Sequence, residues 1–190
     1  LRDIYQKRRA WRALVDLERR ELLRLPPAQQ RAKLTEIAKL ASDRLGDVRE
    51  AIGLWNRALE TNEDDTEALT SLAALYEREK RYLPFAEVLH RLAKQQPEPK
   101  ARVSLLERVG SVFSDRLGAL APAIETYREI LEVQPGHQKT MRLLRDLYAQ
   151  SGRFDELEAL YGQAGNWDEL AEVLNSLAEQ KRESADRLPI

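Results

Sequence analysis

Apolar residues recur along this chain every three or four positions, and no segment alternates apolar and polar residues with a period of two. One stripe comprises Leu34, Ile37, Leu40 and Ala41, and comparable stripes follow almost to the end of the sequence. A spacing of three to four places apolar side chains on one face of an α-helix, whereas strands need the period of two. The pattern therefore predicts an all-α protein.

Glycine and proline mark where the predicted helices end and begin. Gly46, Gly118 and Gly152 each follow a stripe, and glycine readily adopts the left-handed conformation found just past a helix C-terminus. Pro84 and Pro122 fall in first turns, where proline is tolerated. The last of ten predicted helices is expected to divide near Gly162 to Asn166. The ten helices are residues 1–8, 10–24, 29–45, 48–61, 66–79, 83–95, 100–117, 120–133, 138–151 and 154–182.

The sequence also repeats itself at an offset of 72 residues. Residues 42–46 and 114–118 both read Ser-Asp-Arg-Leu-Gly, and further matches follow downstream. Self-similarity at a fixed period is typical of stacked supersecondary units, and half of this period is close to a helix-turn-helix unit of about 34 residues. Each such unit needs a neighbour to cover its apolar face.

Each unit combines small residues with large apolar and aromatic ones. Small residues such as Ala38, Ala73 and Gly110 recur where two helices approach closely. In 66–97 a pattern of large, large, small, aromatic, aromatic and proline is formed by Leu69, Leu72, Ala73, Tyr76, Tyr82 and Pro97. This pattern resembles the tetratricopeptide repeat (TPR), and units 31–63 and 103–135 differ from it by one extra residue in the inner turn.

The resemblance implies an all-α, right-handed α-solenoid of about five antiparallel helix pairs that forms one domain over residues 1–190. Neither terminal helix has the polar character of a capping helix, so we expect the chain to be an excerpt from a longer array. The expected hairpins are about 1–25, 29–62, 66–96, 100–134 and 138–182.

The charge balance of the chain limits the classes of partner that it is expected to bind. The chain has 31 basic and 32 acidic residues, a balance that disfavours a general nucleic-acid binder. Residues 1–33 nevertheless carry ten basic and four acidic residues, and this basic strip could serve an acidic partner or anionic lipid. We favour the alternative, a solvated face partnered by Glu18 and Glu21. The strip comprises Lys7, Arg8, Arg9, Arg12, Arg19, Arg20 and Arg24.

No pattern in the sequence indicates catalytic chemistry. Cysteine is absent, which excludes thiolate ligands and cysteine nucleophiles. His90 and His137 lie far apart, and neither has metal-ligand spacing to another histidine. Every glycine has a repeat or helix role except Gly53, so no phosphate-binding loop is indicated. We therefore expect a protein that is not an enzyme and has no catalytic, metal or cofactor site.

In tetratricopeptide arrays the first helix of each hairpin lines a concave groove, and the resemblance implies the same here. The family's carboxylate clamp pairs Lys with Asn one turn apart, and no asparagine occupies the matching positions, so we expect no capture of chaperone tails. Lys39 and Arg142 are the strongest candidates for contact with an acidic group. The candidate partner-binding residues are Thr35, Lys39, Thr70, Glu77, Glu107, Ser111, Arg142 and Asp146.

These observations favour a protein-interaction scaffold that binds a protein or peptide partner, without nucleic acid and without a membrane-spanning segment. End-to-end self-association is a further expectation from the uncapped ends. The alternatives are a helical accessory domain of a larger enzyme or complex and, less favoured because of the charge balance, an RNA-binding helical repeat. No signal or transmembrane segment is apparent, which weakly favours the cytoplasm.

Overall fold

The structure is a computed structural model that describes residues 1–164 and 167–186, and all regular elements within them are helical. The all-α class is therefore confirmed. The chain divides into two compact units, unit 1 (Leu1–Pro97) and unit 2 (Glu98–Ile190). Within the described residues, no helix is long and apolar enough to cross a membrane.

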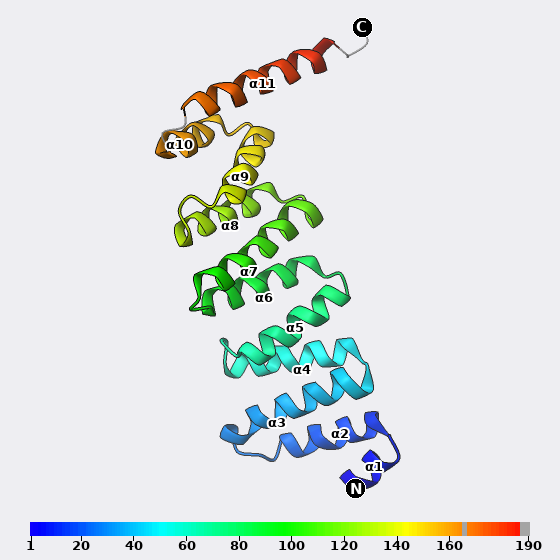
Figure 1. Ribbon diagram of the computed structural model, residues 1–190. Helices are drawn as coiled ribbons and strands as arrows, with labels where there is room; N and C mark the ends of the chain where they lie inside the picture. Colours follow the sequence, from blue (N-terminus) through cyan, green and yellow to red (C-terminus); the bar gives the residue numbers. More distant parts are fainter. Residues whose placement is uncertain (165–166, 187–190) are drawn as a thin grey trace. The chain divides into compact units, whose positions relative to one another are not determined.

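Unit 1 is a series of helices that pack on their neighbours in the sequence (Figure 1). The pairs α3–α4 and α5–α6 form hairpins, and α4 also packs on α5. Helix α3 continues directly into a π-helical turn, η1 (Ala41–Leu45). The helices are α1 (Arg2–Lys7), α2 (Trp11–Leu22), α3 (Pro27–Leu40), α4 (Val48–Thr61), α5 (Thr66–Arg78) and α6 (Tyr82–Gln95).

Unit 2 follows the same plan. Helices α7 and α8 form a hairpin, α8 packs on α9, and α9 packs on α10. A second π-helical turn, η2 (Val112–Arg116), follows α7. The helices are α7 (Pro99–Ser111), α8 (Leu120–Val133), α9 (Gln138–Ser151), α10 (Phe154–Ala164) and α11 (Trp167–Asp186).

The cores combine large side chains with alanine and glycine. Trp55 and Leu72 are almost fully buried, and Ala38 is completely buried, as close helix packing requires. At Gly110 a Cβ atom would lie 2.6 Å from ring atoms of Tyr127, so only glycine lets α7 approach α8 this closely. The predicted role of Gly110 as a small contact residue is confirmed.

The observed helices match the predicted ones closely, with two informative differences. The predicted helices 29–45 and 100–117 are each an α-helix followed by a π-helical turn. The predicted helix 154–182 consists of α10 and α11, and residues 165–166, where the break was expected, lie outside the described residues. One continuous solenoid over 1–190 stays a prediction.

The π-helical turns account for the extra residue and for part of the repeated pentapeptide. A π-turn closes with a bond from residue i to i−5, and Gly46 N donates to the Ala41 carbonyl at 3.0 Å. Gly46 has a φ of 69°, the left-handed region that favours glycine. The serine of the first pentapeptide, Ser42, is bonded to an aromatic side chain 13 positions later. The Trp55 Nε1–H donates a hydrogen bond to Ser42 Oγ at 3.3 Å.

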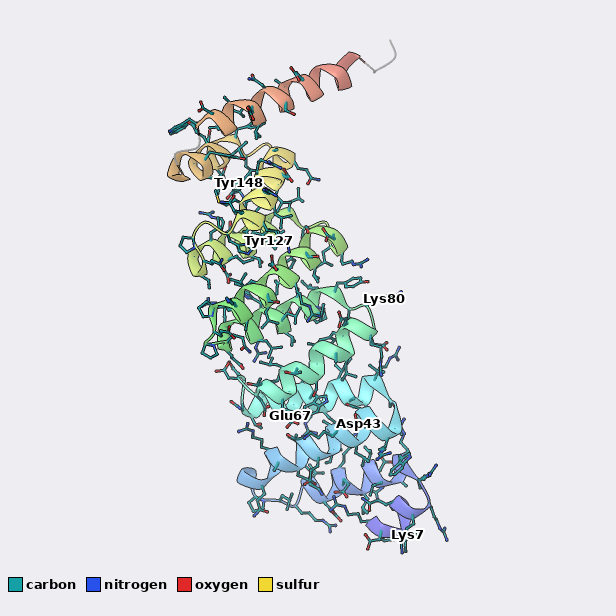
Figure 2. All side chains as sticks on the ribbon, in the orientation of Figure 1. Lys7, Asp43, Glu67, Lys80, Tyr127 and Tyr148 are labelled. Atoms are coloured by element: carbon teal, nitrogen blue, oxygen red, sulfur yellow. The ribbon has the colours of Figure 1, made fainter. Side chains whose placement is uncertain are left out.

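The other two polar residues of the pentapeptide are exposed in both copies. These are Asp43 and Arg44 in η1 and Asp115 and Arg116 in η2, and Figure 2 labels Asp43. The serine and glycine therefore serve the fold, whereas the aspartate and arginine side chains lie on the surface.

Candidate functional site

In unit 1 the first helices of the hairpins, α3 and α5, are joined by two ion pairs. Lys39 Nζ lies 2.5 Å from Glu67 Oε1, and both side chains are half exposed. Arg31 Nη2 lies 2.9 Å from Asp65 Oδ2. Figure 2 labels Glu67 on α5. These contacts join side chains of α3 to the start of α5.

Asp65 connects that ion pair to the start of α5. Its carboxylate accepts hydrogen bonds from the backbone N–H groups of Glu67 and Ala68, both at 3.1 Å, and thereby caps the helix. Burial by itself would raise the pKa of Asp65, but the hydrogen bonds from Ala68 and Arg31 outweigh it and lower that pKa. Asp65 therefore carries its charge at neutral pH.

In unit 2 the first helices α7 and α9 are joined by the same contact with its charges exchanged. Lys139 Nζ lies 2.9 Å from Glu107 Oε1. Lys139 stands 72 residues after Glu67, and Glu107 stands one helical turn before the position that corresponds to Lys39. Both units therefore have an ion pair between their first helices. The lysine lies on the earlier helix in unit 1 and on the later helix in unit 2.

An open pocket of about 310 Å³ lies in unit 2 among η2, α8 and α9. Polar groups come from η2 and α9, and leucine side chains supply the apolar part of the wall. The lining residues are Ser114, Asp115, Gly118, Leu120, Tyr127, Leu143, Asp146, Leu147 and Gln150.

Two serine hydroxyls hold the carboxylate of Asp115 in place. Ser111 Oγ donates to Asp115 Oδ2 at 2.9 Å, and Ser114 Oγ donates to Asp115 Oδ1 at 2.7 Å. The hydrogen bonds from Ser114 and Ser111 lower the pKa of Asp115 below its ordinary value. The pocket therefore presents a fixed negative charge at neutral pH.

Tyr127 contributes a neutral hydroxyl to the same pocket, and Figure 2 labels it on α8. Burial raises the pKa of this phenol, and a hydrogen bond with Ser114 only partly opposes the rise. Across the pocket, Asp146 Oδ1 accepts a hydrogen bond from Arg145 Nε at 2.8 Å. The polar lining is thus rich in hydrogen-bond acceptors.

The residues predicted to bind a partner fall into three groups in the structure. Lys39 and Glu107 are engaged in the ion pairs between first helices, and the hydroxyls of Thr35 and Thr70 donate to backbone carbonyls of their own helices. Asp146 lines the pocket, and Ser111 orients Asp115 beside it. Glu77 and Arg142 are exposed. Partner contact by any of the eight stays a prediction.

Sequence reasoning missed Asp115 and Tyr127 as parts of a site. Asp115 belongs to the repeated pentapeptide, and an exposed residue that recurs in both copies was the available signal. Tyr127 lies within the predicted helix 120–133, where an aromatic side chain indicates core packing, and the residue is buried yet also lines the pocket.

The described residues contain no cluster of three His, Cys, Asp or Glu side chains that could hold a metal ion. No protein-family model matches the sequence, and no curated protein matches it.

Several solved structures are similar to the chain. A crystal structure of MamA is 16% identical with a TM-score of 0.46, over 98% of this chain and 97% of that one. A double mutant of MamA is 16% identical with a TM-score of 0.47, over 92% and 91%. YrrB, described as a TPR protein with an unusual peptide-binding site, is 15% identical with a TM-score of 0.41, over 77% and 84%.

Proposed function

We propose that the chain is a non-catalytic protein-interaction scaffold that binds a protein or peptide partner through the first helices of its hairpins. The pocket among η2, α8 and α9 is the anchor point in unit 2. The observation that carries the proposal is the convergence of Asp115, Asp146 and Gln150 with leucine side chains in one open pocket. Binding sites typically combine apolar walls with a few fixed polar groups.

The chemistry of the pocket favours a partner side chain that donates hydrogen bonds and has an apolar stem. Lysine and arginine fit this description, because their methylene groups can contact Leu143 and Leu147 while the charged head reaches Asp115. The same carboxylates would repel a phosphate backbone, which supports a protein partner over RNA.

The test is capture of partners from a lysate of the source cells by tagged chain. The double variant Asp115→Arg/Asp146→Arg should lose partners that the wild-type chain retains. Glu158→Arg, on the exposed surface of α10, is the matched control and should retain them. Equal capture by all three proteins would contradict the proposed site, provided that circular dichroism shows each to be folded.

A further inference from the structure

Two adjoining hollows lie between α2 and α4, away from the first helices. Their volumes are about 390 and 440 Å³, and they share Arg19 and Arg57. Arginine dominates the lining of both. We call the surface around them the arginine hollow, defined by Asp16, Arg19, Arg20, Arg49, Gly53 and Arg57.

Most acidic side chains near this surface are already occupied. Arg12 Nη2 lies 2.6 Å from Asp47 Oδ2, and Arg19 Nη1 lies 2.7 Å from Glu50 Oε1. Asp47 also accepts the Glu50 backbone N–H at 3.0 Å as the cap of α4. Both carboxylates are therefore already engaged by Arg12 and Arg19.

Glu18 does not serve the basic strip either. It is only 2% exposed, and its carboxylate pairs with Arg2 Nε at 2.7 Å and with Lys33. The sequence-based interpretation that Glu18 partners a solvated basic face is therefore wrong, because Glu18 points into the contact among α1, α2 and α3.

Three arginines of the hollow are left without a partner. Arg20, Arg49 and Arg57 are exposed, and none of them forms an ion pair or hydrogen bond within residues 1–164 and 167–186. Asp16 is the one acidic side chain of the lining that forms no ion pair in that part of the chain. The free charge of the hollow is therefore positive.

Gly53 lines the hollow at a helix position where glycine is unfavourable. It lies in the middle of α4, one turn from Arg49 and one turn from Arg57, where glycine destabilises a helix relative to alanine. A Cβ atom at this position would have no heavy atom within 4 Å. Helix packing and backbone conformation thus give no reason for glycine here, whereas its missing side chain leaves the floor of the hollow open between two arginines.

We infer that the arginine hollow binds an acidic segment of a partner protein, with a glutamate or aspartate carboxylate seated over Gly53 between Arg49 and Arg57. Guanidinium groups bind carboxylates in a planar, two-bond geometry that suits this position. A protein segment fits better than a lipid surface or nucleic acid, because it can place a single carboxylate between Arg49 and Arg57 and uncharged residues beside Asp16, whereas a regular array of phosphates cannot. Leu23, which is 76% exposed beside Arg20, offers an apolar contact to such a segment.

The experiment measures fluorescence anisotropy of a short labelled peptide that alternates glutamate with leucine and alanine, titrated with the full chain. We expect binding that Arg49→Glu/Arg57→Glu weakens about tenfold or more. Gly53→Gln should also weaken binding while it raises Tm, because it fills the hollow and favours the helix. Lys94→Glu, an exposed charge reversal on α6, is the control and should bind like wild type.

Four results would overturn the inference. These are no binding of the peptide, equal loss with Lys94→Glu, wild-type binding by Gly53→Gln, and undiminished binding of a peptide with glutamine in place of glutamate. Binding of phosphatidylserine vesicles or single-stranded RNA without binding of the peptide would likewise show that the hollow serves another class of partner.

Discussion

At the scale of single residues, Gly53 and Gly110 both lie in helices but differ in the space beside them. A Cβ at Gly110 would collide with the Tyr127 ring at 2.6 Å, whereas a Cβ at Gly53 would meet nothing within 4 Å. We expect Gly110→Ala to lower the free energy of unfolding by about 1–3 kcal/mol through overpacking. Gly53→Ala should raise it by about 0.5–1 kcal/mol. Urea unfolding of both variants checks the pair, and shifts of the same sign would contradict the packing described here.

Glu18 is the second case in which one residue decides stability. Its side chain is 3% exposed, and Lys33, with a side chain 12% exposed, supplies one of its two cations. Removing Lys33 leaves Arg2 as the only cation beside this buried carboxylate, so one of its two oxygens loses its partner. We expect Lys33→Met to cost about 1–3 kcal/mol of unfolding free energy.

The matched control for this substitution is Lys94→Met, an exposed lysine on α6. Such a surface change should stay within about 0.5 kcal/mol. If thermal unfolding gave the same small change for both lysines, the buried pairing of Glu18 would be disproved.

At the scale of elements, the reversed polarity of the link between first helices leads to a charge-exchange prediction. Lys39→Glu places two carboxylates opposite each other across α3 and α5, and should lower the unfolding free energy by about 0.2–1 kcal/mol. Lys39→Glu/Glu67→Lys should recover most of this loss. A double-mutant cycle by urea unfolding measures the coupling, and zero coupling would show that the contact does not join the helices.

Acid should weaken the start of α5. The pKa of Asp65 is lowered in the folded state, so its contribution to stability is complete above the ordinary aspartate pKa of about 3.9 and is lost as the pH falls below that value. Asp65→Asn keeps a capping side chain but cannot titrate. The variant should therefore show a smaller fall in Tm than wild type between pH 5 and 2, and parallel curves would count against this role for Asp65.

The spacing of apolar residues by three or four, with glycine and proline at the helix ends, predicted nearly all of these helices. Each amphipathic helix is encoded by its own stretch of sequence, so it can be recognised locally. The π-helical turns were visible only as one extra residue per inner turn, since an insertion can equally be absorbed by a loop. Burial of Glu18 depends on cations from α1 and α3, and the pocket depends on side chains from η2, α8 and α9. Such convergence of separate helices has no local signature.

At the scale of the whole molecule, the two proposed surfaces call for opposite chemistry. The arginine hollow in unit 1 presents free positive charge, whereas the pocket in unit 2 presents the fixed carboxylate of Asp115. A net charge of −1 conceals this separation. A partner that carries both acidic and basic segments could engage both units, and salt should weaken each contact.

We expect a partner to bind unit 2 at the pocket among η2, α8 and α9. Nuclear magnetic resonance of the ¹⁵N-labelled chain, titrated with a partner identified by capture, locates the bound surface residue by residue. Amide shifts in unit 2 should gather at Ser114, Asp115, Asp146 and Gln150. Shifts that spare these residues and map to the exposed surface of α10 would contradict binding at this pocket.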